Sequence, residues 1–497
     1  MRRNTNVALV SLGLLLGTAG CDSFLTGDKL SQNPNLPTAA SIQQLFVGVQ
    51  AGQFAFQEGT VAMMMCEWVQ ACSAGNGRFV QQAAQYVFGE GSNIGANGGD
   101  WISVYAGGGL VDIRQVEADA RGTGDSSWLG VAKIWEALTI GTTSAMWGDI
   151  PYSEAVAGNS HPVLDQRFAI LSALQTLLDE AIAELTDSTG AGPADADLVF
   201  GGDNAKWIKA AWTLKARLYM ETAESLGAPA YANAITAALK GISDPTGDGD
   251  FSSFHTTATS ERNMWAQFQT GSGFGTDLEA GKALVDFMNA QNDPRRASYF
   301  CPNADTTGGL PHYGGDDQNS AGAAGTVSLF VCQPARFADD ARIPYVSYVE
   351  NELILAEANA TAKINGGGGG NDAVALTHLN NARAFANAQY ASPPPPGSAA
   401  LPVLSGLTGA PLLAAVMNEK WIALFQNIES ISDYRRTCIP DITPSHNTQQ
   451  FTKVPGRLFY PQNERNVNPN IPTPSAQLGT HGFRNQGDLD NCTRTAP

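Results

Sequence analysis

The stretch of sequence that decides the fold is AKWIKAAWTLKARLYMETAESLG, residues 205–227. Apolar side chains recur in it at spacings of three and four residues, at Trp207, Ala211, Leu214 and Leu218. This spacing places them on one face of an amphipathic helix. Asp203 and Asn204 are residue types that cap helix N-termini, whereas Gly227 and Pro229 are expected to end the helix.

A similar pattern precedes it in QRFAILSALQTLLDEAIAELTD, residues 166–187, with Asp165 as the expected N-cap. Its apolar face consists of Phe168, Leu171, Leu174, Leu178, Ile182 and Leu185. The linker over residues 189–203 is rich in turn residues. The two helices are therefore predicted to form an antiparallel hairpin.

Helical patterns of this kind recur along the chain. They cover residues 41–57, 97–121, 126–149, 343–364, 371–390 and 412–436. Pro344 is expected in the first turn of its helix, and Gly366–Gly370 and Pro393–Pro396 separate the last three. Recurring helix pairs indicate a mostly all-α fold of tetratricopeptide-like hairpins, with a loop-rich face and minor β structure.

Two regions lack helical periodicity, residues 244–342 and residues 437–497. The first is rich in Gly, Asn, Asp and aromatic residues, and a loop region of this length is usually functional. We expect Trp101, Trp265 and Tyr313 to form a stacking platform for a ligand, and Arg78 to supply polar contacts. For each aromatic residue, packing in the core is the alternative.

The composition excludes several classes of function. The 497 residues carry a net charge of −18 with no basic cluster, which argues against nucleic-acid binding. No catalytic motif, phosphate-binding loop or metal-ligand spacing occurs, so we predict a non-enzyme without cofactor or metal. Asp244, Asp248 and Asp250 lie close together in one predicted loop. Their carboxylates could bind calcium, but a solvated acidic turn is the preferred interpretation.

The N-terminus has the pattern of an export signal. Arg2 and Arg3 precede a short apolar stretch at residues 7–16, and Thr18-Ala19-Gly20-Cys21 resembles a lipobox. We expect residues 1–20 to be a signal peptide and Cys21 to carry lipid; ordinary cleavage with a structural Cys21 is the alternative. Proximity then favours disulfides between the other six cysteines, as Cys66–Cys72, Cys301–Cys332 and Cys438–Cys492, with buried free thiols as the alternative.

Five further segments occur in one order along the chain. They are MWGDIPYSEA (146–155), NDPR (292–295), HYGG (312–315), RIPY to LAEA (342–358) and NEKW to DYRR (418–436). Together they resemble the SusD/RagB family of outer-membrane nutrient-binding lipoproteins. Lys420 stands where the family usually has Arg, and the ligand loops match no family pattern, which leaves the ligand open.

The resemblance implies one domain over residues 21–497. Residues of about 40–230 and 343–436 would form the helical scaffold, about 244–342 the ligand face, and 437–497 an irregular C-terminal region. It also implies an oligosaccharide or peptide ligand and a SusC-like TonB-dependent transporter. We expect the transporter to dock on the hairpins between about residues 130 and 225 and on the N-terminal part of the chain. An extracellular glycoside hydrolase and a purely structural repeat protein are the alternatives from other classes.

Overall fold

The computed structural model of the chain describes residues 40–75, 83, 86, 89, 99–271, 274–317, 325–363, 369–442, 454–479, 484–488 and 493–494. The predicted signal peptide, Cys21, Arg78 and Cys492 lie outside the described residues. Helices dominate the described part, and its strands are two or three residues long. This confirms the mostly helical fold that the sequence predicts.

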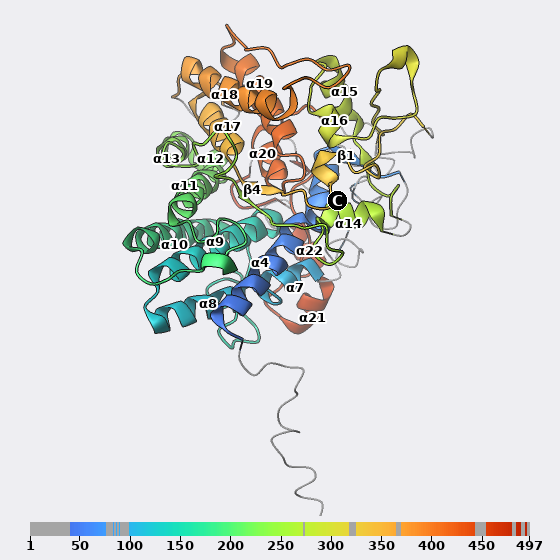
Figure 1. Cartoon of the computed structure of the whole chain (residues 1–497). Helices are drawn as coiled ribbons and strands as arrows, with labels where there is room; N and C mark the ends of the chain where they lie inside the picture. The colour runs from blue at the N-terminus through green and yellow to red at the C-terminus, as the bar shows by residue number, and fades with distance from the viewer. Residues whose placement is uncertain are drawn as a thin grey trace, which may run out of the picture.

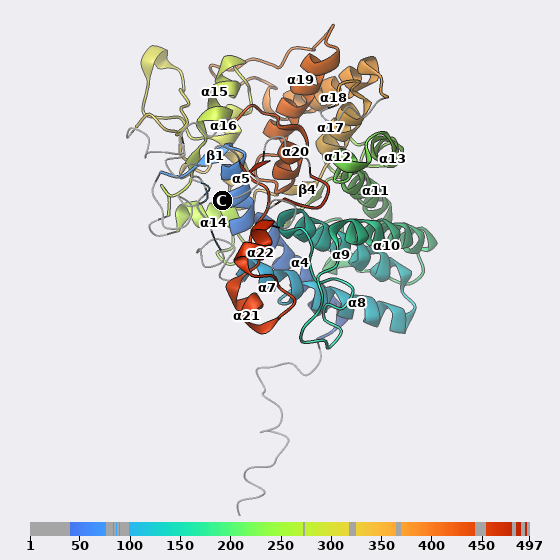
Figure 2. The ribbon, with the colours of Figure 1, turned by 180° about the vertical axis from the view of Figure 1, so that it is seen from behind.

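The elements follow one another as helices with few strands between them (Figures 1 and 2). The helices of the first half are α4 (Ile42–Glu58), α5 (Thr60–Trp68), α7 (Gly99–Tyr105), α8 (Leu110–Thr123), α9 (Ser126–Trp147), α10 (Arg167–Asp187), α11 (Asn204–Met220), α12 (Ala223–Leu226) and α13 (Ala228–Ala238). Those of the second half are α14 (Met264–Thr270), α15 (Lys282–Ala290), α16 (Arg296–Tyr299), α17 (Tyr348–Asn359), α18 (Asp372–Tyr390), α19 (Gly409–Ala423), α20 (Glu429–Thr437), α21 (Gln462–Val467) and α22 (Pro474–Gly479). Short 3-10 helices cover Ala194–Ala196, Thr307–Gly309 and Ala335–Phe337.

The strands of the described residues form three two-stranded pairs. Their bounds are β1 (Cys72–Ser73), β2 (Phe251–Ser252), β3 (Glu279–Ala280), β4 (Pro344–Val346), β5 (Val454–Pro455) and β6 (Thr493–Arg494). β1 pairs with β3 and β2 with β4, both antiparallel, while β5 pairs with β6 in parallel. β1–β3 and β2–β4 join the region 244–342 to segments next to α5 and α17, whereas β5–β6 lies within the C-terminal region.

The long helices pack as successive neighbours. α8 packs on α9, α9 on α10, α10 on α11 and α11 on α13, and the row continues through α17 to α18 and α19 (Figure 1). α9 lies inside this row and is buried on nearly every side. A helix that is apolar around its whole circumference belongs in the interior, which is where α9 lies.

Helix starts confirm one predicted cap and correct another. The Asp203 carboxylate accepts from the backbone N–H groups of Ala205 and Lys206, as expected. Asp165 does not cap α10: its carboxylate accepts from the N–H groups of Tyr152 and Ser153 at 2.9 and 2.8 Å. The N–H of Arg167 is satisfied by Asp149 Oδ1 at 2.9 Å. Tertiary contact across the preceding turn thus replaces the local cap.

Proline positions differ from the prediction in two places. Pro229 does not end a helix but lies in the first turn of α13, where its missing N–H costs nothing. Pro344 lies in β4 rather than in a helix, and α17 begins later, with Ser347 as its N-cap. Apart from the prolines, one helix boundary differs: the single helix predicted over residues 412–436 is divided into α19 and α20.

The segment at 146–155 is a structural connection between α9 and α10. The Trp147 indole donates to Phe459 O at 3.0 Å, which ties it to the C-terminal region. Gly148 has φ +85°, a conformation that other residues rarely adopt. The Tyr152 hydroxyl donates to Glu136 Oε1 at 2.9 Å. These residues therefore shape the fold, and none of them lines the cavity described below.

The later segments meet in a buried ionic cluster formed by Glu357, Lys420, Asp433 and Arg436. Arg436 donates to both oxygens of Glu357, at 2.7 and 2.8 Å. Lys420 donates to Asp433 at 2.6 Å and contacts Glu357 at 3.3 Å. All four side chains are at most 6% exposed. The cluster joins α17, α19 and α20, so the segments at residues 342–358 and 418–436 belong to the helical scaffold.

Two predicted disulfides are present in the structure. Cys66 is bonded to Cys72, and Cys301 to Cys332. Cys438 is also disulfide-bonded, but its predicted partner Cys492 lies outside the described residues. Among the described helices, none is both long enough and apolar enough to span a membrane.

Candidate ligand-binding site

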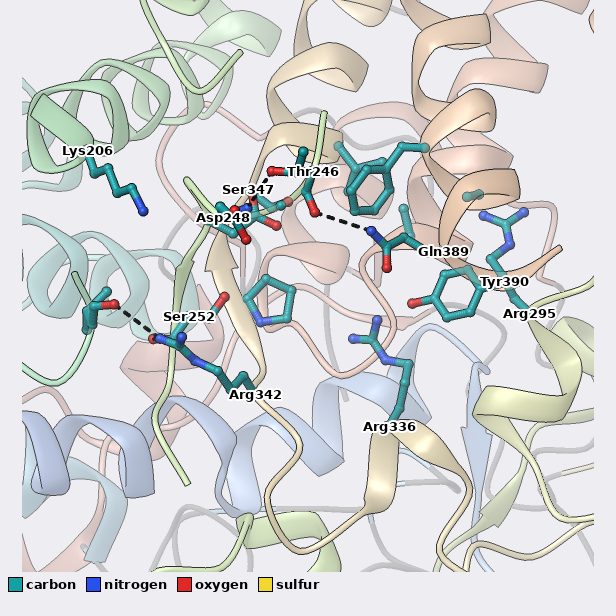
Figure 3. Close-up of a pocket in the computed structure, with 18 of the residues that line it drawn as sticks. Lys206, Thr246, Asp248, Ser252, Arg295, Arg336, Arg342, Ser347, Gln389 and Tyr390 are labelled. Atoms are coloured by element: carbon teal, nitrogen blue, oxygen red, sulfur yellow. Dashed lines mark hydrogen bonds between the residues drawn. The ribbon is translucent and has the colours of Figure 1, made fainter. Parts of the chain in front are cut away.

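A cavity of about 530 Å³ opens between the loop that leads into β2, strand β4, the C-terminal half of α18 and the start of α11 (Figure 3). Part of its lining comes from the irregular region 244–342, as the sequence suggested for the ligand face. The rest comes from helices on either side. Its volume lies in the range of ordinary small-molecule sites.

The rim of the cavity is a tight turn at residues 244–250. Asp244 Oδ1 accepts from both the N–H and the hydroxyl of Thr246, at 2.9 and 2.8 Å, and these bonds lower the pKa of Asp244. Gly247 has φ +86°, and a Cβ there would meet the Phe385 ring at 3.6 Å. Gln389 donates to Thr246 O at 3.3 Å, which ties the turn to α18. The rim is therefore held in place by its own side chains.

Asp250 links this rim to the scaffold. Its Oδ1 accepts from the N–H of Tyr348, the first residue of α17, at 2.7 Å. Burial raises the pKa of Asp250 to about 7, with Glu350 and Asp244 adding to the shift and Arg342 opposing it. The carboxylates of Asp244 and Asp250 thus accept hydrogen bonds from backbone N–H groups. The described residues contain no group of three His, Cys, Asp or Glu side chains that could hold a metal ion.

Three cationic side chains line the cavity without a carboxylate at salt-bridge distance among the described residues: Lys206, Arg336 and Arg342. Arg342 donates from Nε to Ser253 O at 2.6 Å, and its Nη2 reaches Val199 O at 3.3 Å. Burial lowers the pKa of the Arg342 guanidinium. Figure 3 shows Lys206 and Arg342 on one side of the cavity and Arg336 with Tyr390 on the other.

Arg336 is fixed on the cavity floor by neutral partners. Its Nε donates to Gln426 Oε1 and its Nη2 to Phe425 O, both at 2.9 Å. The guanidinium lies 5.1 Å from the centre of the Tyr299 ring. Arg295 also lines the cavity, but Asp293 and Glu419 neutralise it at 2.7 and 2.5 Å.

Aromatic rings complete the walls. Phe200, Phe385 and Tyr390 are partly exposed and line the cavity. Tyr299 lies deeper, stacked on Phe425 with ring centres 4.9 Å apart. Aromatic faces beside hydroxyl, amide and charged groups suit a ligand with both apolar and hydroxylated surfaces.

The aromatic residues singled out in the sequence lie elsewhere. Trp265 is fully buried against Phe337, and Trp101 is 3% exposed and packs on Trp147. Tyr313 is 8% exposed, and the Arg296 guanidinium lies 5.5 Å from its ring centre. A ring without an exposed face cannot stack on a ligand, so in this structure all three are packing residues. Arg78 lies outside the described residues.

Sequence reasoning missed most of the cavity because its residues look like ordinary scaffold. Phe200 occurs in the linker before α11, and Phe385 and Tyr390 occur near the end of an amphipathic helix. Lys206 is the first charged residue after the Asp203 cap, in the first turn of α11. No spacing in the chain connects these positions; only the packing of α11 and α18 around β4 brings them together.

Comparison with known proteins gives a consistent family signal. The SusD-like family model, described as "Starch-binding associating with outer membrane", matches residues 34–461. A SusD-like protein from Bacteroides thetaiotaomicron is similar, at 22% identity and a TM-score of 0.70, over 90% of this chain and 98% of that one.

A second similar structure is a chitin-binding SusD homolog from Flavobacterium johnsoniae, at 18% identity and a TM-score of 0.69, over 91% of this chain and 99% of that one. A third, a SusD/RagB family protein from Bacteroides thetaiotaomicron, has 20% identity and a TM-score of 0.66, over 87% and 95% of the two chains. Among curated proteins, none matches the chain. At these identities the structures establish a common fold.

Proposed function

Because the chain belongs to the SusD-like family, we propose that it is a cell-surface lipoprotein that binds oligosaccharides and delivers them to a SusC-like TonB-dependent transporter. The family description supports both the starch-binding character and the outer-membrane association. Two similar structures carry names that state chitin binding, which favours a saccharide over a peptide as the ligand.

The observation that carries this proposal is the cavity itself. It combines the partly exposed rings of Phe385 and Tyr390 with the hydroxyl of Thr246 and the amide of Gln389. A sugar ring has an apolar face that stacks on an aromatic ring and a rim of hydroxyls that need hydrogen-bond partners. The cavity offers both kinds of contact within about 530 Å³.

We propose binding without catalysis. A glycoside hydrolase needs two carboxylates arranged across the scissile bond. Of the two acidic residues that line the cavity, Asp250 is engaged by the N–H of Tyr348, and Asp248 is exposed at the rim. This arrangement favours a binding protein over the hydrolase alternative.

The anchor and the organisation of the chain are part of the same proposal. Residues 1–20 would be removed on export, and Cys21 would carry lipid and hold the remaining single domain, residues 21–497, at the outer membrane. A hydrophobic core that includes Phe46 and Ile471 supports one domain. The hairpins formed by α9, α10 and α11 would face the transporter.

The test is calorimetry on the exported protein with a panel of neutral and acidic oligosaccharides and of peptides. We expect saturable binding of at least one oligosaccharide class and no continuing release of reducing ends. Binding of peptides alone would contradict the saccharide proposal. Sustained turnover of a bound oligosaccharide would instead support the hydrolase alternative.

A further inference from the structure

We propose that the cavity selects oligosaccharides that carry an anionic group, either a uronate carboxylate or a sulfate ester. This inference rests on the proposed function and specifies its ligand class. It is carried by Lys206, Arg336 and Arg342, which line one cavity and lack carboxylate partners within salt-bridge distance among the described residues.

Among the described residues, other arginines of this chain have the carboxylate partners that the cavity cations lack. Arg217, Arg295 and Arg436 are each buried against carboxylates, at 2.6, 2.5 and 2.7 Å. In these three cases the carboxylates offset the cost of burying a guanidinium charge. At the cavity, the half-buried Arg336 and the exposed Arg342 have no carboxylate at salt-bridge distance among the described residues, and both lie beside an opening large enough for a ligand.

The three cations are held by different kinds of contact. Arg336 is fixed by Gln426 and Phe425, and Arg342 by the carbonyl groups of Ser253 and Val199. These contacts position the guanidinium groups without neutralising them. The Lys206 ammonium extends into the cavity 6.0 Å from the Phe200 ring centre (Figure 3). A charge-assisted hydrogen bond to any of them is stronger than a neutral one.

Acidic residues nearby weaken this attraction in part: Asp197 and Asp250 act on Arg342, and Asp244 acts on Lys206. Asp248 is exposed at the rim, where solvent screens it. Asp250 lies closer to the scaffold, and burial raises its pKa to about 7, so a large fraction is uncharged at neutral pH. The chain as a whole carries a charge of −18, which repels anions. Selection of an anionic ligand must therefore come from the local cations.

The experiment compares matched pairs of saccharides on the exported protein by calorimetry. The uronate pairs are galacturonate, glucuronate and mannuronate oligosaccharides, each beside its methyl ester, which keeps the shape and removes the charge. The sulfate pair is a sulfated galactan oligosaccharide beside its desulfated form. We expect at least one charged member to bind about tenfold or more tightly than its neutral partner, because a hydrogen bond to a charged group is stronger than one to a neutral group.

Three substitutions connect the preference to the cavity. Lys206→Gln and Arg342→Gln should each remove most of the preference, while Arg342→Lys should retain part of it. The matched control is Lys209→Gln, on the same helix, because Lys209 is exposed, bonds Ser243 and does not line the cavity. Melting temperatures of all variants separate loss of binding from loss of folding.

The outcomes distinguish this inference from the proposed function. Neutral and charged partners that bind equally well would overturn the inference and leave saccharide binding in place. A charge preference that Lys206→Gln and Arg342→Gln both leave unchanged would also overturn it. If no saccharide of either kind binds, the proposed function is wrong, and the inference that rests on it is wrong as well. Whether the carboxylate or the sulfate pair responds identifies the source of the negative charge.

Discussion

Removal of the Glu357 carboxylate tests whether the buried cluster of Glu357, Lys420, Asp433 and Arg436 holds the second half of the helical row together. The substitution is Glu357→Gln, which keeps the shape and removes one charge. Arg436 would lose two charge-assisted hydrogen bonds, and Lys420 would keep only Asp433. The side chain is 1% exposed, so water cannot replace these partners.

Two estimates of the folding free energy lost in Glu357→Gln agree in order of magnitude. Burial alone would raise the pKa of Glu357, but Arg436 and Lys420 lower it from 4.5 to about 2, which corresponds to about 3 kcal/mol of stability at neutral pH. Breaking a buried ion pair costs roughly 3–5 kcal/mol. With an unfolding entropy of about 2.1 cal/mol/K per residue over roughly 450 residues, the melting temperature should fall by about 3–5 °C.

The assay is calorimetric unfolding at pH 7.5 beside a matched control, Asp286→Asn. Asp286 pairs with Lys282 in an exposed i,i+4 pair in which both side chains are more than half exposed, so its loss should cost about 0.5 kcal/mol or less. The stabilisation from Glu357 is present above pH 4.5 and declines as pH falls toward 2, because its pKa is lowered in the folded state.

A double variant makes the reasoning refutable even where the single variant folds poorly. Glu357→Gln with Lys420→Met leaves Arg436 beside Asp433 as a balanced pair, so its cost should be smaller than the sum of the two single changes. A Glu357→Gln protein that melts like the Asp286→Asn control, or strictly additive costs in the cycle, would refute the role given to the cluster.

Four further predictions concern the cavity, the irregular region and the docking surface. Tyr390→Ala should weaken oligosaccharide binding by on the order of 2 kcal/mol with little change in melting temperature, and unchanged affinity in calorimetry would remove Tyr390 from the site. Because burial raises the pKa of Asp250 from 3.8 to about 7, its charged form costs stability as pH rises through that interval; Asp250→Asn should raise the melting temperature at pH 8 and leave it unchanged at pH 4, and a uniform effect would contradict this. Replacing both Cys301 and Cys332 by serine opens a loop with a sequence separation of 31 and should cost about 3–4 kcal/mol in chemical unfolding, whereas a loss below about 1 kcal/mol would show that the loop is held by other contacts. Thr176→Lys, at an exposed position of α10, should reduce co-purification with the transporter at unchanged ligand affinity, and an equal loss of both would argue against separate faces.

The sequence alone was sufficient for the helical scaffold, because its signals are local. The apolar face from Trp207 to Leu218 and the Asp203 cap predict α11 without any knowledge of its neighbours, since helix period and capping act within one or two turns. The disulfides Cys66–Cys72 and Cys301–Cys332 were also within reach, because short sequence separation favours their pairing.

The tertiary structure alone determined which side chains are buried and which of them lie side by side. Trp101 and Trp265 lie in the short helices α7 and α14, and the packing of Trp147 and Phe337 against them leaves them buried. Phe385 occurs on an ordinary helix, yet the turn at residues 244–250 places it on a cavity wall. Exposure and proximity depend on contacts between segments that are far apart in sequence, from Trp101 and Trp147 to Gly247 and Phe385, and such contacts leave no periodic trace in the sequence. The scaffold was therefore predictable from local patterns, whereas the cavity and its unpaired cations emerged only from the folded chain.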